Sequence, residues 1–304
     1  MELIVAKPRG FCAGVERAIR TVEMALEQYG RPIYVRKEIV HNSHVVRRLR
    51  EAGAVFVEEL HEVPVGAVAI LSAHGSPPEV YALAKERGLR LIDATCPLVT
   101  KVHKEVHSYV RQDYRVLLIG HAGHDEVIGT MGEAPDHTTL IESVEDARRL
   151  AFGANQKGVI LTQTTLSQDD TQAIVDVLRA RFPQLKMPSA EDICYATQNR
   201  QNAIKALAGE IDLLLVVGST NSSNSLRLTE VAESRGTRAY LIDGPDDIRT
   251  AWLTSAQRIG VSSGASAPED VVQAVLVRLR ELGAREIREI EAPDEGVAFR
   301  LPRV

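Results

Sequence analysis

The sequence has few aromatic residues and no long apolar run, and each shortage narrows the class of protein. Aromatic residues make up 4% of the 304 residues and hydrophobic residues 44%, so a core must consist mainly of aliphatic side chains. No segment approaches the ~18 uninterrupted apolar residues of a membrane-spanning helix. The first residues lack the basic and apolar regions of a secretory signal. We therefore expect a cytoplasmic protein whose cysteines stay reduced.

Basic charge, nucleotide-binding motifs and paired cysteines are also lacking. The net charge of −5 argues against nucleic-acid binding, which needs a dense basic face. Neither a P-loop nor a GxGxxG motif occurs in its required context. The three cysteines include no CxxC pair, which argues against a zinc knuckle or a thioredoxin-type site. Their odd number argues against a purely structural disulfide framework.

Short apolar runs alternate with helical patterns along most of the chain, as in an α/β fold with mostly parallel sheets. The expected strands include residues 116–119, 159–161, 213–217 and 239–242, and the expected helices include 15–29, 45–52, 171–181 and 268–282. This rhythm restarts near Leu3, Val116 and Leu213, which predicts three small lobes. We assign them to residues 1–95, 96–193 and 194–283, and assign 284–304 to a C-terminal tail with an edge strand at 297–299.

Each predicted lobe contains one cysteine, and all three cysteines precede a predicted helix. Cys12 and Cys96 also follow an apolar strand, whereas Cys194 has no clear strand before it. The positive end of a helix favours a thiolate, the form that binds metal ions. One interpretation is a shared metal site. The alternative is three unrelated buried thiols, since cysteine is often only a small core residue.

Polar side chains gather at the predicted strand ends, where α/β sheets bind ligands. Histidines follow three of these strands, at His41, at His74 and in the segment His121 to Glu126. Each alone is more often structural than a ligand. His103 and His107, at i and i+4 on one helix, are interpreted as a solvated face.

Runs of hydroxyl and amide side chains follow three further strands, at 162–165, 219–225 and 262–266. Such residues cap helices, but one cap needs one residue. Together with helix N-termini they bind phosphate oxygens, so the sequence predicts a phosphorylated or diphosphorylated ligand.

Eight motifs between about residues 4 and 280 resemble, in order, those of the 4-hydroxy-3-methylbut-2-enyl diphosphate reductase (LytB/IspH) family. These motifs are Gly10-Phe11-Cys12-Ala13-Gly14-Val15, Ile39-Val40-His41-Asn42, Ser72-Ala73-His74-Gly75, Asp93-Ala94-Thr95-Cys96-Pro97-Leu98-Val99, Gly120-His121 through Glu126, Thr162-Gln163-Thr164-Thr165-Leu166-Ser167, Ser222-Ser223-Asn224-Ser225 and Gly264-Ala265-Ser266-Ala267-Pro268. The tail matches no motif of the family.

The resemblance implies three α/β lobes around a central cavity that holds a [4Fe–4S] cluster, with Cys12, Cys96 and Cys194 as its protein ligands. Four thiolates usually hold such a cluster, so three leave one iron available to substrate oxygen. The implied reaction is the two-electron reductive dehydroxylation of (E)-4-hydroxy-3-methylbut-2-enyl diphosphate to isopentenyl and dimethylallyl diphosphates, the last step of the methylerythritol phosphate route to isoprenoids. The implied electron donor is ferredoxin or flavodoxin, and we expect a monomer or a homodimer.

The resemblance also implies the roles of individual residues. Glu126 is the expected proton source, with Thr164 and His124 helping to move protons, and we expect the anionic ligand to raise the pKa of Glu126. The residues expected to bind substrate are His41, His74, His124, Gln163, Thr164, Thr165, Ser222, Ser223, Asn224 and Ser266. Two other classes stay open: a non-catalytic iron–sulfur sensor, and a cofactor-free thiol enzyme with Cys12 or Cys96 as nucleophile.

Overall fold

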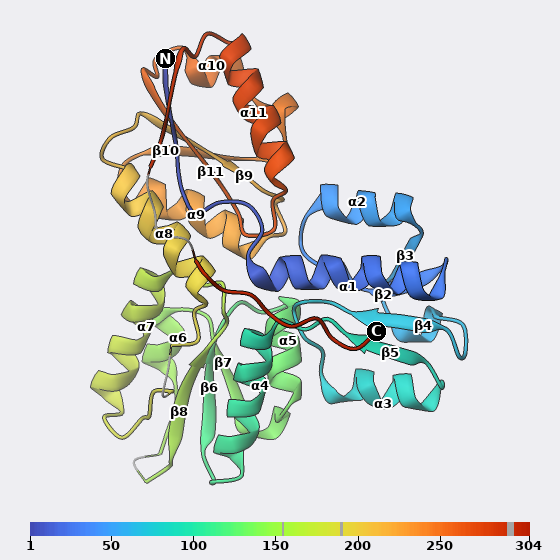
Figure 1. Ribbon diagram of the computed structural model, residues 1–304. Helices are drawn as coiled ribbons and strands as arrows, with labels where there is room; N and C mark the ends of the chain where they lie inside the picture. The colour runs from blue at the N-terminus through green and yellow to red at the C-terminus, as the bar shows by residue number, and fades with distance from the viewer. Residues whose placement is uncertain (154, 189–190, 291–294) are drawn as a thin grey trace. The chain divides into compact units, whose positions relative to one another are not determined.

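The computed structural model describes residues 1–153, 155–188, 191–290 and 295–304, and its strands form three parallel sheets. The chain divides into two compact units: residues 1–16, 41–48 and 195–298 form unit 1, and residues 17–40, 49–194 and 299–304 form unit 2. Figure 1 shows helices flanking the sheets. The prediction of an α/β fold with mostly parallel sheets is confirmed.

Unit 1 contains one sheet of five strands in the order β10-β9-β11-β1-β12. Its strands are β1 (Glu2–Val5), β9 (Leu213–Val217), β10 (Arg238–Ile242), β11 (Arg258–Ser263) and β12 (Glu286–Glu289). Its helices are α8 (Tyr195–Leu207), α9 (Ser223–Ser234), the 3-10 helix η3 (Pro245–Asp247), α10 (Thr250–Leu253) and α11 (Glu269–Glu281).

Both faces of this sheet are covered at its centre, which explains why strand β9 is continuously apolar. Leu213 and Leu215 pack into one hydrophobic cluster with residues of α11, and Leu214 and Val216 pack into another with residues of α8 and α9. Successive side chains of a strand point to opposite faces, so a sheet covered on both sides buries every position.

Unit 2 contains two smaller sheets. The first has the order β3-β2-β4-β5 and the second the order β7-β6-β8. The strands are β2 (Ile33–Arg36), β3 (Ala54–Val57), β4 (Val68–Leu71), β5 (Arg90–Asp93), β6 (Arg115–Ile119), β7 (Thr138–Ile141) and β8 (Gly158–Thr162). The helices of this unit are α3 (Pro78–Glu86), α4 (Pro97–Val110), α5 (Asp125–Gly132), α6 (Val144–Arg149) and α7 (Gln168–Arg181), with the 3-10 helices η1 (Leu60–Glu62) and η2 (Pro135–His137). Helices α1 (Ala13–Tyr29) and α2 (Ser43–Ala52) each contribute residues to both units.

The strands are grouped differently from their order in the chain. The prediction placed residues 1–95 in one lobe, but β1 pairs with β11 and belongs to the sheet formed by the last part of the sequence. The tail contributes β12, which pairs with β1 on its other edge. The predicted edge strand at 297–299 is wrong, because those residues are not in a strand. Residues 291–294 of the predicted tail lie outside the described residues.

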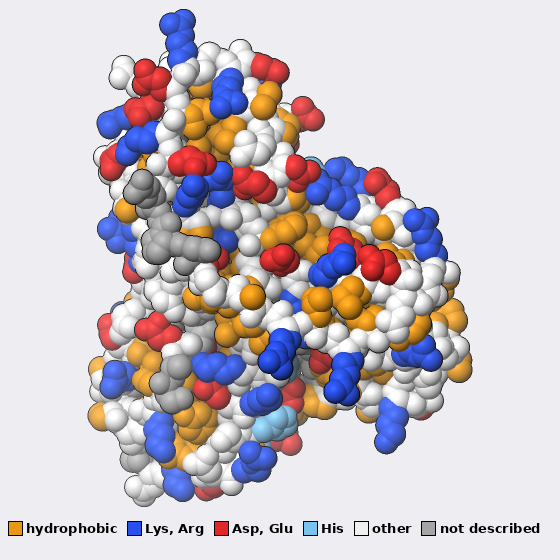
Figure 2. Space-filling model, viewed as in Figure 1, with side chains coloured by type: hydrophobic (Ala, Val, Ile, Leu, Met, Phe, Trp, Pro, Cys, Tyr) orange, Lys and Arg blue, Asp and Glu red, His pale blue; other side chains and the backbone are white. Residues whose placement is uncertain are grey.

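No helix among the described ranges is long and apolar enough to cross a membrane. Lys and Arg side chains are interspersed with Asp and Glu side chains on the face shown in Figure 2. This mixture of charges agrees with the modest net charge of the sequence.

Candidate active site

The three cysteines occupy equivalent positions at the ends of the three sheets. In each case the cysteine backbone N–H donates to the carbonyl oxygen of the second residue after a strand. The pairs are Cys12 with Ala265 after β11 (3.1 Å), Cys96 with Ala73 after β4 (2.9 Å) and Cys194 with Thr164 after β8 (3.0 Å). The next residue begins a helix each time, at Ala13, Pro97 and Tyr195. The prediction that a helix follows each cysteine is confirmed.

This donor set fits an iron–sulfur cluster. The three cysteines are half-buried, and none of them is in a disulfide within the described part of the chain. Each cysteine directly precedes the first residue of a helix, where backbone N–H groups lack partners within the helix. Thiolates are the ligands that such clusters require.

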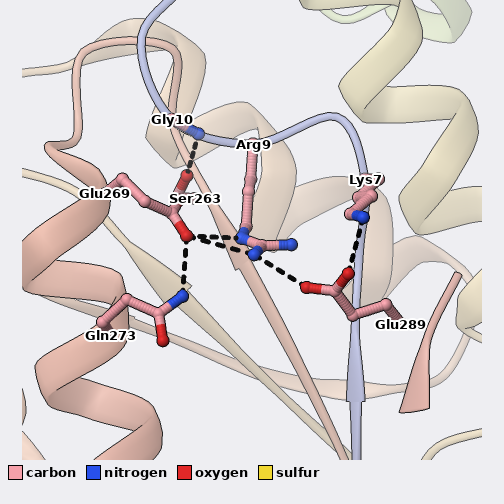
Figure 3. Close-up of polar contacts among 7 residues, drawn as sticks. All are labelled: Lys7, Arg9, Gly10, Ser263, Glu269, Gln273 and Glu289. Atoms are coloured by element: carbon pink, nitrogen blue, oxygen red, sulfur yellow. Dashed lines mark hydrogen bonds and ion pairs between the residues drawn. The ribbon is translucent and has the colours of Figure 1, made fainter. Parts of the chain in front are cut away.

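The loop that carries Cys12 is fixed by a group of charged side chains in unit 1 (Figure 3). Arg9 donates to Glu269 at the start of α11 (Nε and Nη2 to Oε1, 3.2 and 3.0 Å) and to Glu289 of β12 (2.8 Å). Gly10 N donates to Ser263 Oγ at the end of β11 (2.9 Å). The strand contributed by the tail therefore helps to hold the first cysteine loop.

Glu126 and Thr164 form a buried acid–hydroxyl pair in unit 2. Glu126, in the first turn of α5, is 3% exposed. Its Oε1 accepts from Thr164 N (2.6 Å), and its Oε2 lies 3.0 Å from Thr164 Oγ1. Thr164 lies just beyond β8, whereas α7 begins later and is capped by Ser167. The hydroxyl of Thr164 therefore serves the acid and is not a helix cap.

Burial raises the pKa of Glu126 to about 7, since a carboxylate is poorly solvated in the interior. The two hydrogen bonds from Thr164 lower this pKa, and the negative charge of Asp192 raises it. The predicted increase in pKa therefore arises in the protein without a ligand, mainly from burial and to a smaller extent from the charge of Asp192. A carboxyl group with this pKa can hold a proton at neutral pH and release it.

Two of the predicted histidines lie together in unit 2. The rings of His74 and His124 are 5.9 Å apart between centroids and nearly perpendicular. His124 is the N-cap of α5, and its Nδ1 accepts from Glu126 N (3.2 Å). A neutral ring that accepts at Nδ1 carries its proton on Nε2, which leaves Nε2 as a donor.

Gln163 and Thr165 are held by contacts within the protein. Gln163 is 1% exposed, its Oε1 accepts from His121 N (3.1 Å) and its Nε2 donates to Thr165 Oγ1 (2.9 Å). The bond from His121 connects the turn after β6 to the turn after β8, and the bond to Thr165 lies within the turn after β8. The geometry supports a positioning role for Gln163 more directly than substrate contact.

The serine and asparagine cluster lies in unit 1, at the start of α9. Ser222 caps this helix by accepting from Ser225 N (3.3 Å), so the capping alternative is correct for this residue. Asn224 is 5% exposed, and neither of its amide atoms has a hydrogen-bond partner among the described residues. A buried amide without partners is costly, so a polar ligand would compensate it.

Two glycines allow this cluster to lie against the sheet. A Cβ atom at Gly264 would lie 2.0 Å from Ser225 Oγ, and one at Gly218 would lie 2.3 Å from it. Any side chain at either strand end would therefore displace the start of α9. The glycines after β9 and β11 are required by close packing.

The remaining predicted residues of unit 1 lie on nearby turns. Ser266 Oγ donates to the backbone oxygen of His41 (3.0 Å), which joins the turn after β11 to the segment before α2. Ser223 begins α9. Unit 1 thus contains Cys12, His41, Ser222, Ser223, Asn224 and Ser266, and unit 2 contains the other predicted site residues, Cys96, Cys194, His74, His124, Glu126, Gln163, Thr164 and Thr165.

Sequence reasoning missed the charged residues that support the cysteine loops. Arg9 supports the Cys12 loop, and Asp192 and Lys101 support the Cys194 loop. The sequence feature that could have revealed them is a charged residue two or three positions before each cysteine. The interpretation of His103 as part of a solvated face is wrong, since it is 8% exposed and its Nδ1 pairs with Glu133 (2.7 Å).

The fold and these side chains define an α/β protein with cysteines, a buried carboxyl group and a buried amide beyond the carboxyl ends of parallel strands. The chain belongs to the LytB protein family, whose model matches residues 3–280. The resemblance found in the motifs is therefore confirmed.

Named relatives and solved structures agree with this assignment. The chain is 56% identical over 302 residues to the 4-hydroxy-3-methylbut-2-enyl diphosphate reductase of Mycolicibacterium paratuberculosis, a match that covers 99% of this chain and 91% of the relative. It resembles the solved E-1-hydroxy-2-methyl-but-2-enyl-4-diphosphate reductase from Plasmodium falciparum, with a TM-score of 0.97, 41% identity and coverage of 99% and 95%. A second solved structure, of (E)-4-hydroxy-3-methyl-but-2-enyl diphosphate reductase, the terminal enzyme of the non-mevalonate pathway, matches with a TM-score of 0.66, 32% identity and coverage of 92% and 99%.

Proposed function

We propose that the protein is a 4-hydroxy-3-methylbut-2-enyl diphosphate reductase and that Cys12, Cys96 and Cys194 hold a [4Fe–4S] cluster. The observation that carries this proposal is the repeated placement of the three cysteines, each with its backbone N–H bonded beyond a strand end and each directly before a helix. Relatives more than 50% identical over nearly the whole chain have the same name. When bound, the cluster supplies one-electron transfer and a Lewis-acidic iron.

The overall reaction removes the hydroxyl group of an allylic alcohol. Two electrons and two protons enter, the C–O bond breaks, a C–H bond forms, and the products are water and an isopentenyl or dimethylallyl diphosphate. Hydroxide is a poor leaving group, so its oxygen must receive a proton as the bond breaks. Glu126 provides that proton, because it is buried and has a pKa of about 7.

Thr164 connects the acid to the substrate. Its hydroxyl lies 3.0 Å from Glu126 Oε2, so it can take a proton from the carboxyl group while giving its own to the oxygen of the substrate. Thr164 N fixes the other carboxyl oxygen at 2.6 Å and so sets the direction of Oε2. Gln163 keeps this turn in place through His121 and Thr165.

The diphosphate is bound by neutral donors and histidines. Asn224 offers a buried amide, Ser222 and Ser223 lie at the N-terminus of α9, and Ser266 lies beyond β11. Helix N-termini of this kind bind phosphate oxygens through backbone N–H groups. His41, His74 and His124 add imidazole N–H donors.

The electron donor in this proposal is ferredoxin or flavodoxin, and the cytoplasm is the compartment that keeps the three thiols reduced. We propose a monomer or a homodimer that binds neither nucleic acid nor membrane.

Anaerobic purification followed by iron and sulfide analysis tests the cluster, and turnover of the allylic diphosphate with a reduced dye tests the reaction. We expect a coloured protein with about four irons per chain and dye oxidation that depends on the substrate. A coloured protein without turnover would favour the sensor, and a colourless protein would favour the thiol enzyme.

A further inference from the structure

Asp192, two residues before Cys194, has a buried carboxylate that the proposed reaction does not use. Its side chain is 0% exposed. One carboxylate oxygen accepts from Thr162 N at the end of β8 (3.1 Å), and the other lies 2.7 Å from Lys101 Nζ. A buried charge is retained in a fold only when it is paired and hydrogen-bonded, and here both conditions are met.

Lys101 comes from the helix that begins directly after Cys96. Its ammonium group donates to Asp192 and also to the backbone oxygen of Glu191 (3.3 Å). It therefore ties the segment before Cys194 to the first turns of α4, the helix that begins directly after Cys96. Within unit 2, one side chain thus connects the elements that carry two of the three cysteines.

The same segment is also attached to the residues of the proposed acid. Cys194 N donates to Thr164 O (3.0 Å), and Thr164 N donates to Glu126 Oε1 (2.6 Å). A displacement of residues 191–194 would therefore move a proposed cluster ligand and disturb the turn that orients the acid.

The charge on Asp192 is the main counter-charge for Lys101. Glu105 also lies near this ammonium group, with its Oε2 3.5 Å from Nζ. Burial, and then the charge of Asp192, raise the pKa of Glu105 to about 7. The carboxylate of Asp192 lies closer to Lys101 Nζ (2.7 Å) and is therefore the stronger partner.

We propose that Lys101 is a positioning residue for the cluster, because its bonds to Glu191 and Asp192 hold the Cys194 loop against the helix that follows Cys96. This inference rests on the proposed function. Residues that orient metal ligands affect metal retention by about 10- to 100-fold, although they do not touch the metal. Lys101 is not itself a proposed cluster ligand, but it holds the segment that carries Cys194.

The test measures iron release from the anaerobically purified holoenzyme in the presence of a ferrous chelator, together with the electron paramagnetic resonance spectrum after reduction. We expect Lys101→Met to release iron about tenfold faster than wild type and to alter the spectrum. Lys101→Arg should restore much of the retention, because a guanidinium group can also pair with Asp192. Lys104→Met is the matched control, since Lys104 is exposed on the same helix and should leave both readouts unchanged.

A double variant separates positioning from general destabilisation. Lys101→Met leaves a buried carboxylate without its counter-charge, and Lys101→Met combined with Asp192→Asn removes both charges while an amide oxygen can still accept from Thr162 N. We expect the double variant to recover thermal stability but to keep the rapid iron release. If the double variant is as stable as wild type and also releases iron as slowly as wild type, the inference is overturned. A wild-type protein that contains no iron would instead overturn the proposed function and the inference with it.

Discussion

The raised pKa of Glu126 predicts how the rate of the enzyme depends on pH. With a pKa of about 7, about half of the molecules hold the acidic proton at pH 7. At the ordinary value of 4.5 only about 0.3% would do so, so burial increases the share of competent enzyme by roughly 150-fold. If this proton is used in the reaction, kcat should fall about tenfold for each pH unit above about 8.

The perturbation is Glu126→Gln. The amide oxygen can still accept from Thr164 N, and the amide nitrogen can donate to Thr164 Oγ1, so the local hydrogen bonds are conserved. The amide has no proton to give. We expect kcat to fall by about 100- to 10,000-fold, as is typical when a general acid is removed, with the iron content unchanged.

The same variant should be more stable than wild type at high pH. The pKa of Glu126 is higher in the folded protein than in the unfolded chain, so the folded state favours the protonated carboxyl group. Below pH 4.5, the pKa of the unfolded chain, Glu126 is protonated in both states and does not change the free energy of unfolding. As pH rises through 4.5 the unfolded chain ionises first, so the free energy of unfolding falls, and this loss is complete above about pH 7. A difference of roughly 2.5 pKa units corresponds to about 3 kcal/mol. Glutamine does not ionise and avoids this cost.

Steady-state assays between pH 6 and 9 and urea unfolding of both proteins at pH 5 and pH 8.5 check these expectations. Glu145→Gln, at an exposed position on α6, serves as the control and should change neither readout. Turnover retained in Glu126→Gln, or a wild-type rate that does not fall above pH 8, would refute the assignment of the acid. A stability difference that does not depend on pH would refute burial as the cause.

Three further predictions concern other parts of the site. Thr164→Val removes a hydrogen bond that lowers the pKa of Glu126, so the pKa should rise, and kcat should still fall about 10- to 100-fold because the proton route is lost; a pH–rate profile measures both effects. Asn224→Ala should raise KM for the diphosphate about tenfold with little change in kcat, since a buried amide contact costs roughly 1 to 3 kcal/mol, and an unchanged KM would remove Asn224 from the binding site. Arg9→Met breaks the bonds that hold the Cys12 loop and should speed iron release from the holoenzyme about tenfold, whereas Arg20→Met, at an exposed position, should behave as wild type.

Most secondary structure could be predicted because each element is determined by neighbouring residues. The run at 213–217 is short and apolar at every position, as expected of a strand covered on both faces, and the structure has β9 at those residues. The helix after Cys96 begins with proline, which suits the first helical position, and α4 begins there. The prediction of an edge strand at 297–299 was wrong because the strand of this region depends on pairing with a distant part of the chain. The strand of that region is β12, which alternates charged residues with one isoleucine and is stabilised by pairing with β1.

The histidines show a similar limit. A pair at i and i+4 on a helix cannot reveal which elements pack over it. In the structure His103 lies against Gly75, where a Cβ atom would be 3.0 Å from the ring and φ is +83°. His107 remains half exposed beside the same glutamate that binds His103.

Short-range patterns and motifs in a fixed order were sufficient to predict the α/β class, the helix start after each cysteine, and the family to which the chain belongs. The folding of the whole chain decided which strands share a sheet, since the pairing of β1 with β11 and β12 joins residues that are distant in the chain. It also decided the pKa of Glu126 and the ion pair of Lys101 with Asp192, because burial and charge proximity depend on side chains that only the folded chain brings together.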